Sequence, residues 1–142
     1  LLRAHQYWRM KRLAVDLDGR RFARWGLAFK PDTDDMREAP SRVIVEALHA
    51  RGATIAAYDP VAMDEARRIY AGTAGIDFAA SPYAALDGAD GVIVATEWKE
   101  FRSPAFARMR DMLRTPLVFD GRNLYDPADV RAAGLEYFGI GR

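Results

Sequence analysis

A loop near the start of the chain carries side chains that suit an anionic and partly aromatic ligand. Residues 25–41 include the ring of Phe29 and two separated cations, Lys30 and Arg37. A lysine contacts phosphate or ribose oxygens as a flexible point charge, and an arginine, such as Arg122 in a later loop, contacts them as a rigid fork. We therefore expect Lys30 and Arg122 near such oxygens, with Phe29 stacked on a base or walling it off. The alternative is that Phe29 belongs to the core and Lys30 is solvated.

Acidic side chains in the same loop raise the question of a metal site. They are Asp32, Asp34, Asp35 and Glu38. Their spacing does not match the calcium-binding loop of an EF-hand. We therefore expect no metal, and we interpret these acids as caps, turn residues and salt links to Arg37.

The use of cysteine and histidine narrows the chemistry further. The chain has no cysteine, which excludes disulfides, thiolate zinc sites and a cysteine nucleophile. Its two histidines lie in helix-like segments, and the sequence has neither a Ser-His-Asp order nor a His-x-x-x-His spacing. We therefore expect no catalytic residue in this chain, and half of an active site rather than a whole one.

Apolar runs that favour strands alternate with amphipathic runs that favour helices. Strands are predicted at 21–29, 53–58, 76–79, 91–96, 117–119 and 135–138. Helices are predicted at 4–17, 42–51, 62–70, 83–86, 103–113 and 126–133. After the N-terminal helix, this alternation indicates an α/β fold with a doubly wound, mostly parallel, six-stranded Rossmann-like sheet in the order 3-2-1-4-5-6. Arg24 is awkward within it, because central parallel strands are buried on both faces.

The strand order predicts where a ligand would bind. Open α/β sheets bind ligands outside the carboxyl ends of their strands, where the strand order switches. The segments 29–37, 96–99 and 120–123 should converge there. The first of them lacks the G-x-G-x-x-G spacing of a dinucleotide-binding turn. Asp59 stands where a Rossmann fold has its ribose-binding acid, but without that glycine pattern we interpret it as a turn cap.

Length and composition describe an ordinary globular chain. Its 142 residues favour one domain, and its net charge of +1 predicts no nucleic-acid partner, although residues 1–30 carry eight Lys or Arg against two Asp. No apolar run approaches the ~20 residues that span a bilayer. We therefore expect no membrane partner. The absence of cysteine fits a reducing cytoplasm, so we also expect a cytoplasmic location. Because the chain opens within a helix-like pattern and without Met, we expect a fragment, with a connector helix at 1–19 and a folded domain at 20–142.

The motifs named above resemble those of a known family. Residues 26–41 are similar to the signature that opens the C-terminal, UDP-binding domain of UDP-glucose 6-dehydrogenases, and the wider UDP-glucose/GDP-mannose dehydrogenase family shares a looser form of it. Residues 57–60, 95–98 and 120–123 then follow in the family's order. The resemblance covers nearly the whole predicted domain, from about residue 20 to residue 138.

This resemblance carries implications for function. Members of the family oxidise the sugar 6-hydroxyl of a nucleotide sugar, such as UDP-glucose to UDP-glucuronate, in two NAD-dependent steps, which serves polysaccharide biosynthesis. An N-terminal domain holds NAD, a central helical region supplies the catalytic cysteine and a homodimer interface, and the C-terminal domain covers the sugar nucleotide. The resemblance implies that Phe29, Lys30 and Arg122 contact the UDP-sugar. It implies that Arg37 reaches the cofactor, and that this chain alone does not turn over.

Two rival interpretations stay open. The chain could be the same domain of a dehydrogenase that acts on GDP-mannose or a UDP-N-acetyl sugar, although Met36 and residues 39–40 favour the UDP-glucose form of the motif. It could instead be a non-enzymatic dimerisation module, in which the apolar helix that carries Tyr7 and Trp8 mediates assembly.

Overall fold

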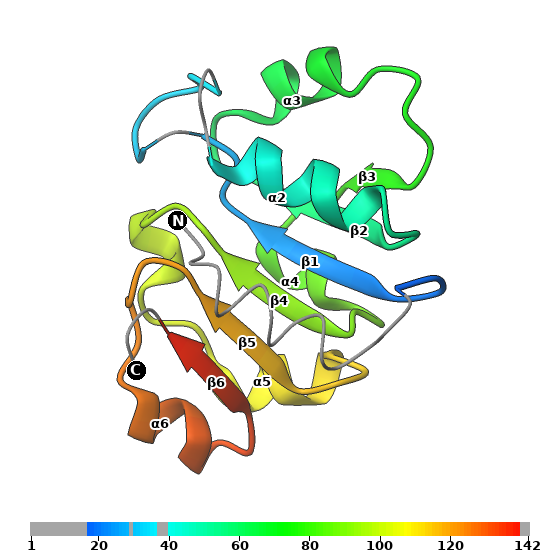
Figure 1. Cartoon of the computed structure of the whole chain (residues 1–142). Coiled ribbons are helices and arrows are strands. Elements are labelled where there is room, and N and C mark those ends of the chain that lie inside the picture. Colours follow the sequence, from blue (N-terminus) through cyan, green and yellow to red (C-terminus); the bar gives the residue numbers. More distant parts are fainter. Residues whose placement is uncertain (1–16, 29, 37–39, 140–142) are drawn as a thin grey trace.

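A doubly wound parallel sheet organises the chain (Figure 1). The computed structural model describes residues 17–28, 30–36 and 40–139. Its sheet has six strands in the order β3-β2-β1-β4-β5-β6, and every neighbouring pair is parallel. The predicted fold class and strand order are therefore confirmed. The helix predicted at 4–17 falls almost wholly outside the described residues.

The described elements follow the predicted alternation. The strands are β1 (Arg21–Trp25), β2 (Thr54–Tyr58), β3 (Ile76–Phe78), β4 (Gly91–Val94), β5 (Leu117–Asp120) and β6 (Glu136–Gly139). The helices are α2 (Pro40–His49), α3 (Met63–Ile69), α4 (Pro82–Leu86), α5 (Phe106–Met112) and α6 (Pro127–Ala132), with a 3-10 turn η1 (Lys99–Phe101) before α5. Two helix starts have the expected chemistry. Ser81 accepts from the N–H of Ala84 ahead of Pro82, and Asp126 accepts from the N–H of Ala128 ahead of Pro127.

Side chains of the strands alternate between two apolar layers. On one face, strand residues such as Phe22 and Ile93 pack with α2 and α3, whereas on the other face Trp25 and Val94 pack with α4, α5 and α6. Trp25 stacks on Phe101 with ring centroids 5.2 Å apart. Burial on both faces fixes the register of the central strands, because a slip of one residue would exchange the two layers.

β1 ends earlier than the predicted strand because the backbone turns at Gly26. This glycine has φ of 94°, and its N–H donates to the carbonyl of Tyr58 at 2.8 Å. A Cβ placed there would lie 2.5 Å from Cβ and 2.7 Å from the backbone nitrogen of Thr96. A side chain at this position would therefore separate the ends of β1 and β4.

Arg24 is buried in the middle of β1, on the face that packs against α2 and α3. Its side chain is 1% exposed, and Nη1 lies 3.5 Å from the carbonyl oxygen of Ile93. Nε and Nη2 have no hydrogen-bond partner in the described part of the chain. Burial lowers the pKa of Arg24 to about 9, although the charges of Tyr70 and Asp59 partly offset this effect. The sequence-based expectation of a misfit is thus confirmed, and the cation is kept at a cost in stability.

Replacing Arg24→Met should stabilise the fold. Exchanging an unpaired buried ion for an apolar side chain of similar length is expected to raise the free energy of unfolding by about 1–4 kcal/mol at pH 7, as measured by urea denaturation. In the wild type, the unfolded chain binds the proton more tightly than the folded chain does, so wild-type stability should rise as pH rises past about 9. The gap between the two proteins should then narrow by about 1 kcal/mol between pH 7 and pH 10. A less stable variant, or a gap that does not change with pH, would contradict this account.

Gly26→Ala should destabilise more than an alanine at a glycine of similar φ in open space. Contact with Thr96 adds to the strain of a positive φ, so a loss of roughly 2–5 kcal/mol is expected. Gly72 is the matched control, because it has φ of 78° and no described atom lies within 4 Å of the place that an alanine Cβ would take. Gly72→Ala should cost about 1–2 kcal/mol. Equal losses for the two variants in urea denaturation would show that the contact with Thr96 does not matter.

Candidate functional site

The carboxylate of Asp59 organises the carboxyl edge of the sheet. It is buried directly after β2 and accepts five hydrogen bonds from three loops. The donors are the N–H groups of Leu27 (2.8 Å), Ala28 (3.1 Å), Val61 (2.9 Å) and Ala62 (2.8 Å) and the indole N–H of Trp98 (3.1 Å). Its interpretation as a turn cap is therefore confirmed, and the same group also joins the loops after β1 and β4.

Thr96 adds a second link between these two loops. Its hydroxyl donates to the carbonyl of Ala28 at 2.9 Å, and the side chain is buried. The N–H of Ala95 donates to the carbonyl of Trp25 at 3.0 Å. The backbones that follow β1 and β4 are thus fixed relative to each other before any ligand is present.

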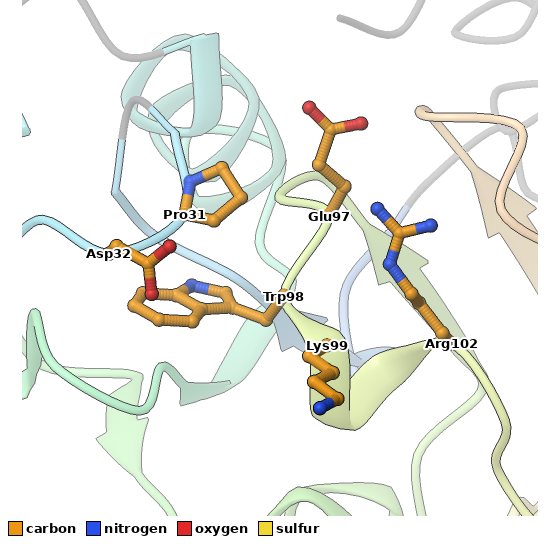
Figure 2. Close-up of a pocket in the computed structure, with 6 residues that line it drawn as sticks. All are labelled: Pro31, Asp32, Glu97, Trp98, Lys99 and Arg102. Atoms are coloured by element: carbon orange, nitrogen blue, oxygen red, sulfur yellow. The ribbon is translucent and has the colours of Figure 1, made fainter.

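A cavity of about 560 Å³ lies at this edge, between the loops after β1 and β4 (Figure 2). Its lining residues are Pro31, Asp32, Glu97, Trp98, Lys99 and Arg102. Trp98 is 7% exposed, and because its indole N–H is bound to Asp59, its ring serves as a fixed apolar wall. Asp32 has φ of 64°, an uncommon conformation for a residue with a side chain. The edge where strand order reverses therefore holds a space of ligand size.

Cations gather around this cavity. Lys99 and Arg102 line it, and the exposed Lys30 precedes its lining residue Pro31. These three side chains form no ion pair with another described residue. Because no described acid pairs with these three cations, their N–H groups can donate hydrogen bonds to an anionic ligand.

Arg122 approaches the same region from the loop after β5. A nitrogen of its guanidinium, Nη2, lies 3.9 Å from Oε1 of Glu97, on the cavity wall. Its backbone N–H donates to the buried carboxylate of Asp120 at 3.1 Å. Asp120 also accepts from the N–H of Tyr125 at 3.0 Å and from the hydroxyl of Tyr137 at 2.8 Å. This network fixes the backbone from which the Arg122 side chain extends.

Tyr58, the last residue of β2, carries a phenol that resists ionisation. Burial raises the pKa of its phenol to about 12, and a hydrogen bond to Glu100 and the charges of Glu100 and Asp59 act in the same direction. The phenol therefore stays neutral at physiological pH and packs edge-on against Phe101, 6.2 Å between ring centroids.

The structure places some of the predicted site residues and not others. Lys30 and Arg122 lie at the same edge of the sheet, and the three predicted segments meet there through the cavity and the contact between Arg122 and Glu97. Phe29 and Arg37 lie outside the described residues. Sequence reasoning identified the segment 96–99 but not the individual positions of Glu97 and Arg102, because one sequence does not show which loop side chains point into a shared space.

The described residues offer neither a metal cluster nor a membrane span. They contain no group of three or more His, Cys, Asp or Glu side chains that could hold a metal ion. No helix among them is long and apolar enough to cross a membrane.

Asp59→Asn should destabilise the protein well beyond the cost of an exposed charge. The amide nitrogen cannot accept the hydrogen bonds that one carboxylate oxygen now receives, so a loss of roughly 3 kcal/mol or more is expected in urea denaturation. Asp77→Asn is the matched control, since the Asp77 side chain is 64% exposed in its pair with Arg21, and it should cost about 0–1 kcal/mol. Similar losses for both variants would contradict the central role of Asp59.

Known proteins match most of the sequence. The family model for the UDP binding domain of the UDP-glucose/GDP-mannose dehydrogenase family matches residues 23–127. The chain is 51% identical over 127 residues to UDP-glucose 6-dehydrogenase of Pseudomonas aeruginosa, which covers 87% of the chain and 28% of that protein. It is 42% identical over 127 residues to the Rhizobium meliloti protein of the same name, with 89% and 28% covered.

Solved structures agree with these sequence comparisons. A UDP-glucose dehydrogenase from Pyrobaculum islandicum superposes with a TM-score of 0.77 at 32% identity, and covers 96% of this chain and 28% of that one. An NDP-N-acetyl-D-galactosaminuronic acid dehydrogenase from Methanosarcina mazei superposes with a TM-score of 0.79 at 26% identity, with 98% and 29% covered. The chain thus spans less than a third of the length of these relatives. Its fold, its motifs and these matches together show that it belongs to the UDP-glucose/GDP-mannose dehydrogenase family, as the UDP-binding domain.

Proposed function

We propose that the chain is the C-terminal nucleotide-sugar-binding domain of an NAD-dependent UDP-glucose 6-dehydrogenase, which converts UDP-glucose to UDP-glucuronate. The observation that carries this proposal is the cavity at the carboxyl ends of β1 and β4, near which Lys30, Lys99 and Arg102 form no ion pair with a described acid. A UDP-sugar offers the matching chemistry, a diphosphate beside a flat base. The names of the relatives support this choice of ligand.

In this proposal the domain binds and encloses the substrate, and the chemical steps belong to other domains. Lys30 and Arg122 donate to the diphosphate, and Phe29 contacts the UDP-sugar. The preformed edge of the sheet then excludes water and holds the sugar against the reacting groups of the parent enzyme. Binding energy from the remote nucleotide thereby orients the reacting carbon, and this isolated chain is inactive.

The sequence between β1 and α2 lacks the glycine pattern by which a dinucleotide fold binds NAD. The link between β1 and α2 runs from Gly26 to residue 39 and lacks the tight glycine turn that brings a helix N-terminus to a pyrophosphate. We therefore assign the binding of NAD, which accepts the hydride when it is bound, mainly to the N-terminal domain of the parent enzyme. Arg37 is proposed to reach it across the domain cleft.

The same proposal covers the organisation of the parent protein. Residues 20–142 form the nucleotide-sugar domain, and residues 1–19 connect it to central and N-terminal domains that complete the active site. The parent is proposed to be a cytoplasmic homodimer with a role in polysaccharide biosynthesis. The partial coverage of the relatives supports the existence of the further domains.

Binding of UDP to this chain tests the proposal. A titration followed by chemical-shift changes in nuclear magnetic resonance spectra should give a dissociation constant in the high micromolar range or weaker, because only part of the proposed contact surface is present. Arg122→Ala should weaken binding by about tenfold, and Lys30→Ala by a smaller factor because its side chain is exposed. Arg67→Ala, which removes an exposed charge from α3, should leave the affinity unchanged. The assignment would be contradicted if neither Lys30→Ala nor Arg122→Ala changed the affinity for UDP. It would also be contradicted if the chain bound NAD more tightly than UDP.

The same titration separates the related substrates. GDP and UDP-N-acetylglucosamine should bind more weakly than UDP-glucose if the uracil and the unsubstituted sugar are recognised here. A preference for GDP would assign the domain to a GDP-mannose dehydrogenase. A preference for the N-acetyl sugar would align it with the dehydrogenases of N-acetyl sugars that share its fold.

A further inference from the structure

Two acidic residues, Asp32 and Glu97, line the cavity that we propose binds a diphosphate. Glu97 lines the cavity with its side chain 42% exposed. The proposed ligand carries a diphosphate, and two like charges a few ångströms apart repel each other. A glutamate at this position is therefore unfavourable for binding unless it does something for a neighbouring cation.

The position of Glu97 is fixed from both sides along the chain. Thr96 before it is bound to the carbonyl of Ala28, and Trp98 after it is bound to Asp59. The backbone at Glu97 thus has little freedom to withdraw the carboxylate from the cavity. Figure 2 shows the carboxylate of Glu97 and the ammonium of Lys99 pointing in opposite directions, so these two residues do not form an ion pair.

Arg122 is the cation that Glu97 reaches. Its Nη2 lies 3.9 Å from Oε1 of Glu97, a distance of electrostatic attraction rather than of a full hydrogen bond. Its Nε is buried and has no hydrogen-bond partner in the described part of the chain. Asp120 holds the backbone of Arg122 but contacts it through the N–H alone. Among the described residues, Glu97 is therefore the acid that forms an ion pair with this guanidinium.

We propose that Glu97 is a positioning residue, which holds the guanidinium of Arg122 at the cavity so that its remaining N–H groups can donate to the diphosphate of the ligand. This inference rests on the proposed function, since it takes Arg122 to be a ligand-binding group. It adds a residue whose own charge opposes the ligand and whose benefit is exerted wholly through its neighbour. A flexible arginine would have to be ordered at the moment of binding, and the ion pair supplies that order beforehand.

Replacing Glu97→Gln distinguishes positioning from simple electrostatics by the sign of the effect. If Glu97 acted only by repelling the diphosphate, removal of its negative charge would strengthen the binding of UDP. If Glu97 positions Arg122, the same change should weaken UDP binding by about three- to tenfold. Glu97→Asp keeps the charge and should restore part of the loss. Glu136→Gln removes the same charge at the start of β6 and should have no effect.

A double-mutant cycle shows whether the effect passes through Arg122. In the Arg122→Ala background, Glu97→Gln should no longer weaken UDP binding, and should strengthen it slightly by relief of repulsion. An equal loss in both backgrounds would overturn the proposal. Tighter or unchanged binding by Glu97→Gln in the otherwise wild-type chain would also overturn it, while leaving the proposed function intact. If the wild-type chain binds no UDP, or Arg122→Ala binds it as well as wild type does, the proposed function fails first.

A measurement without ligand completes the test. The Nε–H of Arg122 can be assigned in ¹⁵N spectra by its absence from Arg122→Lys, and its heteronuclear relaxation reports picosecond-to-nanosecond order. In the wild type this bond should be as rigid as the backbone, and in Glu97→Gln it should become mobile with no change in the thermal midpoint of unfolding. A rigid Nε–H in Glu97→Gln would overturn the proposal.

Discussion

The hydrogen bonds to the buried carboxylate of Asp59 are the constraint on which the carboxyl edge of the sheet depends. Loops that leave three different elements all donate to this one group. The arrangement resolves a problem of parallel sheets, because strands end there with N–H groups that have no partner within the sheet. A single anion satisfies these donors and also replaces, with protein groups, the role that a bound phosphate has in dinucleotide folds. The cavity bounded by Trp98 lies beside this network, because the indole N–H of Trp98 is one of its donors.

The strand order could be predicted from the sequence because burial and alternation are local properties. Four-residue apolar runs such as Gly91–Val94 indicate strands buried on both faces, and the right-handed crossover rule then leaves few topologies. The turn-capping role of Asp59 could also be predicted, since its bonds to Val61 and Ala62 are local. Its bond to Trp98, 39 residues away, could not, because nothing in a sequence shows which distant donor a buried carboxylate will meet.

The candidate site could be predicted at the level of segments and not of side chains. Topology brings the loops after β1, β4 and β5 to one edge of the sheet. The sequence therefore predicts that the loop carrying Lys30 and the loop carrying Arg122 lie close together. The pairing of Arg122 with Glu97 depends on rotamers and on where Asp120 fixes the backbone, and these follow from tertiary packing. Arg24 shows the opposite case. Its poor fit to a central strand was visible from its residue type alone, and its burial without sufficient partners follows from the strand around it.

The shared carboxylate has a mechanical consequence for the carboxyl edge of the sheet. Since the loops after β1, β2 and β4 are bound to one another through Asp59, they cannot swing separately to grip or release a ligand without breaking several buried hydrogen bonds at once. In the parent enzyme proposed above, this edge would therefore have to open and close around a ligand as one unit. The rate of ligand entry and exit would then depend on movement of the whole domain, and not on separate movements of these loops.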